Sequence, residues 1–256
     1  PEYGNKKFFD PACGSGGMFV QAARYMHKHN KQAATDDVMQ FVCNGVEKEP
    51  DTVKLAKMNL LLNNVRGEIK EANSFYSDPY NAYGNYDYVM ANPPFNQKAR
   101  RAENELKTDS RWHGYETPPT SNANYGWILN IVSKLSANGV AGFLLANGAL
   151  SGEGIELNIR RQLLQNHIVE AIVILPRNMF YSTDISVTLW ILNRNKKARI
   201  VEQNGKMIKY RNRENEVLFI DLRQWGEPFE KKYIQFSQEQ ITEIATNFHN
   251  WQREGK

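Results

Sequence analysis

The chain has 256 residues, a length that suits one large α/β domain or two small ones. Its hydrophobic content of 41% excludes a disordered chain, and no apolar run reaches the ~18–20 residues of a membrane helix, so we expect no membrane partner. Two cysteines exclude a disulfide scaffold and fit a reducing cytosol, hence a cytoplasmic location, while a net charge of +4 permits a nucleic-acid partner without demonstrating one. The five histidines lack metal-ligand spacing, so no metal site is expected.

Apolar runs and helical spacings alternate along the chain. Strands are predicted at residues 7–10, 41–46, 68–73, 86–91, 140–145, 168–175, 187–192 and 217–221. Helices are predicted at residues 18–26, 50–62, 125–135, 155–164 and 238–251, and a turn at Asn138-Gly139. This order predicts an α/β fold with a mostly parallel central sheet and helices on both faces.

A glycine-rich turn follows the first predicted strand. Its residues are Asp10, Pro11, Ala12, Cys13, Gly14, Ser15, Gly16 and Gly17. Glycines permit a tight turn close to a ligand, and the next helix offers free N–H groups and a positive dipole end. Neither a Gly-x-Gly-x-x-Gly pattern nor a following Gly-Lys-Ser/Thr is present, which argues against a dinucleotide fingerprint and a phosphate loop.

Glu47 closes the second predicted strand, where an acid in nucleotide-binding α/β folds accepts hydrogen bonds from ribose hydroxyls. It stands farther from Gly16 than the ~20 residues of a dinucleotide site. The alternative for Glu47 is a solvated acid at the end of a strand.

A second polar motif, Asn92-Pro93-Pro94-Phe95, follows the fourth predicted strand. Two prolines stiffen the turn and remove backbone donors, which leaves the Asn92 side-chain oxygen and the Pro93 carbonyl as acceptors for an amine with two N–H groups. Phe95 adds an aromatic surface for a planar ring. The alternative is a rigid loop with a capping asparagine.

The glycine-rich turn and the Asn-Pro-Pro-Phe motif, in this order, resemble motifs I and IV of the γ-type N6-adenine DNA methyltransferases that use S-adenosylmethionine. Within this group, the chain resembles the modification (methylation) subunit of type I restriction–modification systems. Further similar stretches are residues 47–63, 123–150, 154–164, 175–185 and 217–221, so that the resemblance covers nearly the whole chain.

The resemblance implies a Rossmann-like, class I S-adenosylmethionine-dependent methyltransferase fold. Residues 1–256 would form a single catalytic domain, a fragment of a longer subunit, with a basic hairpin-like stretch at 194–221 and a C-terminal helix at 237–251. Relative to the family, a helical N-terminal region and a segment before the first strand are lacking, so an incomplete cofactor pocket, weak cofactor affinity and little activity are expected of this chain alone.

The resemblance also assigns roles to single residues. Asp10 and the turn from Pro11 through Gly17 would bind the methionine moiety of S-adenosylmethionine, and Glu47 its ribose. Asn73 and Ser74 occupy the place where the family often has an aspartate that contacts the cofactor adenine. Asn92 and Pro93 would hold the target amino group, with Pro94 in the same turn and Phe95 stacked on the base.

The implied activity is methyl transfer from S-adenosylmethionine to N6 of an adenine flipped out of DNA, in a complex with a specificity subunit and a restriction subunit. One alternative is a methyltransferase for another amine or amide, namely N4-cytosine, an RNA base or a protein glutamine. Another is a non-catalytic assembly module. Asn92 and Phe95 favour adenine.

Two charged stretches carry weaker signals. Residues 96–122 interleave basic and aromatic residues, including Arg100, Arg101, Arg111 and Trp112, which suits either DNA contacts or a solvated loop. Residues 194–213 hold eight Lys and Arg residues against Glu202 alone, which suits a surface for DNA or a partner subunit, or a solvated hairpin.

Overall fold

The structure, a computed structural model, describes residues 6–29, 42–98, 102–181, 184–203 and 206–254. Arg100 and Arg101 of the predicted basic and aromatic loop, and Phe41 of a predicted strand, lie outside these described residues. The chain divides into two compact units, residues 2–143 and residues 144–256. The expectation of a single domain stays a prediction.

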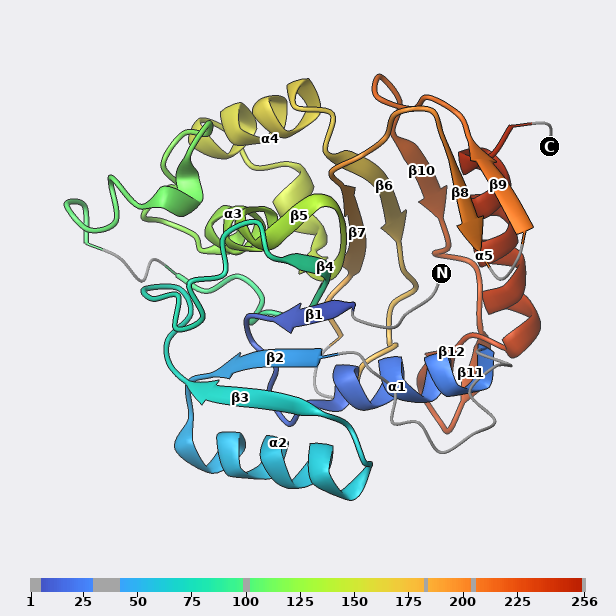
Figure 1. Cartoon of the computed structure of the whole chain (residues 1–256), viewed down its shortest axis with the longest axis horizontal. Helices are drawn as coiled ribbons and strands as arrows, with labels where there is room; N and C mark the ends of the chain where they lie inside the picture. The colour runs from blue at the N-terminus through green and yellow to red at the C-terminus, as the bar shows by residue number, and fades with distance from the viewer. Residues whose placement is uncertain (1–5, 30–41, 99–101, 182–183, 204–205, 255–256) are drawn as a thin grey trace. The chain divides into compact units, whose positions relative to one another are not determined.

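The unit of residues 2–143 is built on parallel strands in the order β5-β4-β1-β2-β3 (Figure 1). Its elements are β1 (Lys7–Asp10), α1 (Gly17–His29), β2 (Val42–Glu47), α2 (Pro50–Leu62), β3 (Gly67–Glu71), β4 (Tyr86–Ala91), the 3-10 helix η1 (Ser110–Trp112), α3 (Asn124–Lys134) and β5 (Leu135–Ala146). Because the strands are parallel, the segments that follow β1, β2 and β4 leave the sheet at the same edge.

Alternate residues of a strand point to opposite faces of the sheet, and the helices α1 and α2 cover one of these two faces. Phe8 of β1 lies in a buried cluster with residues of both helices. Phe9 points the other way, with its ring 4.7 Å from Tyr86 and 6.1 Å from Tyr80. Asp10 therefore shares the side of Phe8, the side of α1 and α2.

The strand β5 begins earlier than predicted, directly after α3. Tyr86 and Tyr88 of β4 are two positions apart, yet they pair with Leu135 and Val140, which are five apart. The predicted turn at Asn138-Gly139 lies in this irregularity, where extra residues bulge out of an otherwise parallel ladder. The chain therefore turns within the strand rather than before it.

The unit of residues 144–256 pairs β6 with β10 in parallel and with β7 in antiparallel fashion. Its elements are η2 (Asn147–Leu150), α4 (Ile155–Gln165), β6 (Val169–Ile174), β7 (Val187–Asn193), β8 (Arg199–Gln203), β9 (Lys206–Tyr210), β10 (Leu218–Asp221), β11 (Glu227–Phe229), β12 (Tyr233–Gln235) and α5 (Gln238–Gln252). Most long strands of the chain pair in parallel, so the predicted α/β class with a mostly parallel sheet is confirmed.

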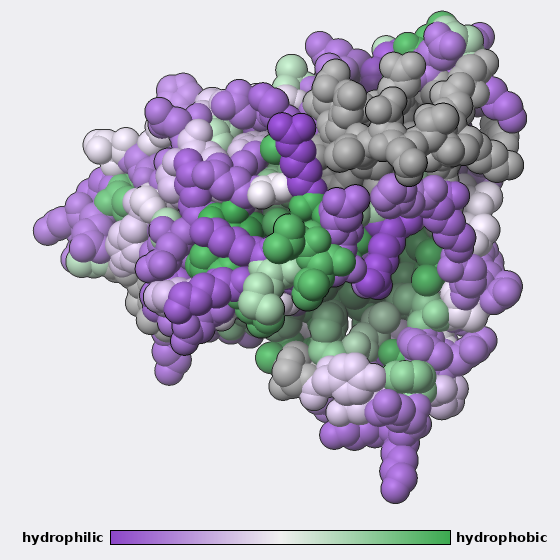
Figure 2. All heavy atoms as spheres, turned by 60° about the horizontal axis from the view of Figure 1, so that its bottom comes forward, coloured by the Kyte–Doolittle hydropathy of each residue, from purple (hydrophilic) through white to green (hydrophobic). Residues whose placement is uncertain are grey.

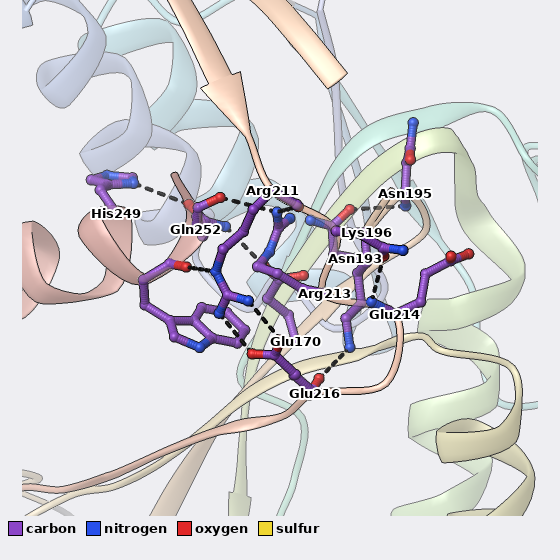
Figure 3. A network of polar contacts seen from close by, with 12 residues as sticks. Glu170, Asn193, Asn195, Lys196, Arg211, Arg213, Glu214, Glu216, His249 and Gln252 are labelled. Carbon is purple, nitrogen blue, oxygen red and sulfur yellow. Dashed lines mark hydrogen bonds and ion pairs between the residues drawn. The ribbon is translucent and has the colours of Figure 1, made fainter. Parts of the chain in front are cut away.

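The basic stretch of residues 194–213 contains the antiparallel pair β8 and β9. Several of its cations are used inside the unit (Figure 3). Arg213 donates from Nε to Glu170 Oε1 at 2.9 Å with both side chains fully buried, and Gln252 of α5 donates to the same oxygen at 3.0 Å. Lys196 is also buried, and its ammonium donates to the carbonyls of Val169 and Glu216.

The expectation of an open basic surface is therefore wrong for part of this stretch. Besides Lys196 and Arg213, Arg211 is committed to a fork with Glu216 and to the carbonyl of Trp251. Among the described residues of the stretch 194–213, the exposed cations are Arg194, Lys197, Lys206 and Lys209.

The helix α2 carries large apolar side chains on its outer surface. Leu55, Met58, Leu61 and Leu62 are all more than half exposed. Figure 2, which brings forward the side of the molecule that lies at the bottom of Figure 1, shows apolar residues gathered among polar ones there. None of the helices within the described ranges combines the length and apolar character needed to cross a bilayer.

Candidate active site

The two sequence motifs meet at the carboxyl edge of the parallel strands. The glycine-rich turn follows β1, Glu47 ends β2, and Asn92 follows β4. β1 lies between β2 and β4, with Asp10 opposite Gly45 and Phe9 opposite Val89. This neighbour relation brings residues that are far apart in the sequence to one edge of the sheet.

The glycine-rich turn leads directly into α1. Gly16 has a φ of 75°, in the left-handed region that side-chain-bearing residues avoid. Its carbonyl accepts hydrogen bonds from the amides of Phe19 and Val20, at 3.1 and 3.3 Å, which starts the helix. The amide of Cys13 donates to the Val46 carbonyl at 3.0 Å, which fixes the turn against β2. The N-terminal end of α1 thus faces this edge of the sheet, with free N–H groups for a polar ligand.

Asp10 is a buried carboxyl group at the base of this turn, with only 1% of its surface exposed. Burial raises the pKa of Asp10 to about 7; the Ala12 N–H, which donates to Oδ1 at 2.9 Å, opposes this rise, and the charge of Glu47 adds to it. A carboxyl group with this pKa loses its proton readily when a cationic ligand binds beside it, because the positive charge favours the ionised form.

Glu47 joins the end of β2 to the turn. Its Oε2 accepts the Gly14 N–H at 3.1 Å, and its Oε1 accepts the N–H groups of Lys48 and Glu49 at 2.8 and 2.9 Å. The side chain is half-buried. It is therefore a held carboxylate, not the freely solvated acid that was the alternative, and its oxygens keep lone pairs for ligand hydroxyl groups.

The larger of two adjoining cavities has a volume of about 750 Å³ and brings Asn92 together with the turn. Asn92 is exposed and borders this cavity with Asp10 and Gly14. Its other lining residues are Phe8, Ala12, Cys13, Ser15, Gly17, Met18, Gln21, Ala22, Tyr25, Met26, Tyr88 and Met90. A polar rim at the two motifs thus adjoins a mostly apolar wall.

The smaller cavity, of about 140 Å³, is bordered by four more of the predicted cofactor residues, Pro11, Glu47, Asn73 and Ser74, whereas the buried Gly16 lines neither cavity. The smaller cavity is lined by Pro11, Ala12, Val46, Glu47, Lys48, Ala72, Asn73, Ser74, Phe75, Pro94, Gln97 and Trp127. Ala12 borders both cavities. Glu47, Asn73 and Ser74, which the resemblance assigned to the cofactor, therefore meet at this cavity, and Pro94, which it assigned to the target base, lines the same cavity.

Asn73 and Ser74 are already engaged with the backbone. Asn73 Oδ1 accepts the Phe75 N–H at 3.1 Å, while its side chain remains exposed. The buried Ser74 hydroxyl donates to the Pro11 carbonyl at 2.5 Å, which ties the segment after β3 to the glycine-rich turn. Ser74 thus shapes the cavity wall, whereas Asn73 keeps its amide hydrogens for a ligand.

Two predicted residues of the second motif lie away from these cavities. Pro93 is buried, and Phe95 is half-buried; neither borders the two cavities, although both belong to the described part of the chain. Asn92 is the member of this motif on the larger cavity, and Pro94 is its member on the smaller one.

Several lining residues were not found from the sequence. Tyr88 and Met90 line the larger cavity, and they alternate with Asn92 on the same side of β4, so strand periodicity could have indicated them. Phe75 and Trp127 line the smaller cavity, with ring centroids 5.9 Å apart in an edge-to-face arrangement. No local pattern distinguishes Trp127 from the other buried residues of α3, because its place depends on tertiary packing.

The two cysteines are buried and unpaired, and burial raises the pKa of both thiols, so neither is a ready nucleophile. Within the described ranges, no group of three or more His, Cys, Asp and Glu side chains could hold a metal ion. The site therefore offers positioned acceptors and two carboxyl groups, Asp10 at the larger cavity and Glu47 at the smaller one.

Known proteins resemble this chain over nearly its whole length. A family model described as N-6 DNA Methylase matches residues 2–256. The HindI methylase subunit of a type I restriction enzyme from Haemophilus influenzae is 37% identical over 248 residues, which cover 96% of this chain and 51% of that protein. The MjaIX methylase subunit of a type I restriction enzyme from Methanocaldococcus jannaschii is 33% identical, over 94% of this chain and 40% of that protein.

A solved structure is similar as well. The methyltransferase subunit of a type I restriction–modification system from Streptococcus thermophilus superimposes with a TM-score of 0.81 at 25% identity, over 97% of this chain and 48% of that one. The chain therefore spans about half the length of these relatives. Since the family model matches almost every residue, this chain belongs to the N-6 DNA methylase family.

Proposed function

We propose that this chain is the catalytic part of a DNA methyltransferase that transfers a methyl group from S-adenosylmethionine to adenine N6. The observation that carries the proposal is the shared cavity of Asn92 and Asp10, which joins an amine-accepting motif to a cofactor turn. The resemblance to methylase subunits of type I restriction enzymes supports the same reaction.

The acceptors of the second motif explain how an adenine amino group becomes a nucleophile. The N6 lone pair is delocalised into the ring, which makes the amine a poor nucleophile. Asn92 Oδ1 and the Pro93 carbonyl, by accepting both N–H groups, would draw the nitrogen toward tetrahedral geometry and concentrate its lone pair. The exposed position of Asn92 suits a base that has left the DNA stack.

The residues around the two cavities fit S-adenosylmethionine. When bound, this cofactor supplies a sulfonium methyl group that an amine can take while the sulfur leaves as a neutral thioether. Asp10 and the amides at the start of α1 would hold the charged methionine end, because Asp10 is buried beside the cavity and can ionise there. Glu47, Asn73 and Phe75 would hold the nucleoside in the smaller cavity.

The partners follow from the relatives' names and remain part of the proposal. Methylase subunits of type I restriction enzymes are the proteins that this chain resembles. We therefore expect the whole subunit to act on DNA together with a specificity subunit and a restriction subunit. The other amine and amide substrates, and a purely structural module, are the competing functions.

The test uses the full-length subunit with its specificity subunit. Tritiated S-adenosylmethionine should label DNA in the assembled complex, with the label recovered as N6-methyladenine. Label recovered as N4-methylcytosine, in RNA or in protein would replace the substrate assignment. No transfer to any of these, despite measurable cofactor binding, would favour the assembly module.

A further inference from the structure

Arg111 is a buried cation in the segment that follows the Asn-Pro-Pro-Phe motif. It is 5% exposed, so it is not one of the open DNA contacts that the sequence suggested. Its Nε donates to Asp109 Oδ1 at 2.8 Å, and its Nη2 donates to Asp109 Oδ2 at 2.7 Å. Burial acts to raise the pKa of Asp109, but the hydrogen bonds and charge of Arg111 outweigh it and lower that pKa.

The same guanidinium reaches the wall of the smaller cavity. Nη1 donates to the carbonyl of Ser74 at 2.7 Å, and Nη2 donates to the carbonyl of Phe75 at 2.7 Å. Both residues line that cavity. Asn130 of α3 also donates to the Ser74 carbonyl, at 3.2 Å, and the Ser74 hydroxyl donates to Pro11. Ser74 therefore connects Arg111, α3 and the glycine-rich turn.

Apolar contacts support this connection. Leu106, from the same segment as Arg111, packs against the buried cluster of Phe75, Ala123 and Trp127. Trp112 is buried, and its indole N–H donates to the Leu106 carbonyl at 2.8 Å. The segment of residues 106–112 is thus packed behind the aromatic wall of the smaller cavity.

We propose that Arg111 is a positioning residue for cofactor binding, which holds Ser74 and Phe75 in place through their carbonyls. The proposal rests on the proposed function, because the nucleoside of S-adenosylmethionine is the ligand of this wall. The Arg111 guanidinium donates to both oxygens of Asp109 and to two carbonyls from three nitrogen atoms, whereas a lysine would offer three N–H groups from a single nitrogen, so it cannot reproduce this arrangement. Loss of Arg111 should weaken cofactor binding and leave the transfer step intact, since Asn92 lies on the other cavity.

The chain offers a matched control for this side chain. Asp221 and Arg223 repeat the fork of Asp109 and Arg111, with Nε to Oδ1 at 2.9 Å, Nη2 to Oδ2 at 2.7 Å and the Arg223 amide to Oδ1 at 3.0 Å. This second fork is exposed, and among the described residues its guanidinium donates to Asp221 alone. Arg223→Lys therefore removes the same local geometry without touching a cavity.

The experiment compares Arg111→Lys and Arg223→Lys in the full-length subunit assembled with its specificity subunit. The measurements are the Kd of S-adenosylmethionine, the Kd of methylthioadenosine (the nucleoside without the amino acid), the cofactor KM and kcat. Arg111→Lys should weaken both ligands by the same factor, about tenfold, with kcat at saturating cofactor within about twofold of wild type. Arg223→Lys should change none of these values.

Affinities within twofold of wild type in a folded Arg111→Lys variant would overturn the proposal, and so would a loss of kcat alone. If Arg111→Lys does not fold, Asp109→Asn decides. The backbone N–H of Arg111 donates to Asp109 Oδ1 at 2.9 Å, and an asparagine oxygen can still accept it, whereas the loss of the negative charge weakens the fork with the guanidinium. Asp109→Asn should show the same loss of both affinities on a smaller scale, and unchanged affinities would overturn the proposal. A wild-type complex that binds neither ligand would instead contradict the proposed function, and with it the premise for Arg111.

Discussion

The two units bury charged side chains in different ways. In residues 2–143, Asp10 and Arg111 lie beside cavities, and part of their hydrogen-bonding serves the cavity wall. In residues 144–256, Glu170 and Arg213 are fully buried against each other, and Gln252 of α5 completes the group (Figure 3). The first arrangement is organised around space for a ligand, whereas the second joins a strand to the C-terminal helix.

This difference teaches how to interpret a buried charge. A buried ion pair is weak evidence for stability, since desolvation opposes the attraction, but loss of one partner is costly. A buried carboxyl group beside a cavity, such as Asp10, instead has a raised pKa that a bound cation can reverse. Substitutions in the first unit should therefore change ligand binding, and those in the second should change folding.

The largest effect is expected at Asn92. Asn92→Ala would remove one of the two acceptors that we propose for the target amine, so methyl transfer by the assembled enzyme should fall about 100-fold or more. Cofactor Kd, measured by calorimetry, should stay unchanged because Asn92 belongs to the target motif. Asn104→Ala, at an exposed residue of the following segment, is the control and should retain full activity. Loss of cofactor binding in Asn92→Ala would refute the role given to this residue.

A large effect on folding is expected at Arg213. Arg213→Met leaves the Glu170 carboxylate buried with only the Gln252 amide, which should reduce the free energy of unfolding by about 3–5 kcal/mol. Urea denaturation followed by tryptophan fluorescence gives this value. The double variant Glu170→Leu/Arg213→Met should recover much of the loss, and cofactor Kd should not change in either. A double variant no more stable than the single one would show that the pair itself is not the cause.

A pH dependence of cofactor binding is expected from Asp10. Its pKa in the folded chain is raised to about 7, and a cationic methionine end favours the ionised form. Affinity should therefore rise as the pH increases toward 7, by about tenfold per pH unit at the low end, and level off above it. Calorimetry from pH 5.5 to 8.5 measures this, and Asp10→Asn should remove the slope. A slope that survives in Asp10→Asn would assign the titration to another group.

The stability of the unliganded chain should change in the opposite direction. The pKa of Asp10 in the folded chain lies above its ordinary value of 3.8, so the folded chain binds the proton more tightly than the unfolded chain does. The stability that this provides, as free energy of unfolding, is fully present below pH 3.8. That contribution is lost as the pH rises to about 7. Thermal unfolding without cofactor should therefore show a stabilising effect of Asp10→Asn at pH 8 that disappears near pH 4.

The smallest effect is expected at the exposed fork of Asp221 and Arg223. Exposed ion pairs gain little, because water screens them and ordering long side chains has an entropic cost. Arg223→Ala should therefore shift the Tm by less than about 2 °C and leave activity unchanged. A larger shift would show that the fork has a partner beyond its own turn.

The local parts of the site could be predicted from the sequence, because they depend on strand ends and turns. Asp10, Glu47 and Asn92 end or follow parallel strands, so periodicity alone places them at one edge. The sequence pattern suggested Arg111 and Trp112 as open nucleic-acid contacts, but both side chains are buried. A local charge pattern does not reveal the distant carbonyl group to which Arg111 donates. Arg213 escaped prediction for the same reason, since Glu170 lies 43 positions away.

The contact between Gly126 of α3 and the ring of Phe75, in the wall of the smaller cavity, limits which residues can occupy position 126. A Cβ atom at this position of α3 would lie 2.5 Å from the ring of Phe75, which real side chains do not tolerate. Glycine within a helix is less favourable than alanine by about 1 kcal/mol, so selection for helix stability alone would replace it. A larger residue should therefore be accepted at position 126 only where residue 75 is smaller, so the two positions should change as a pair among relatives.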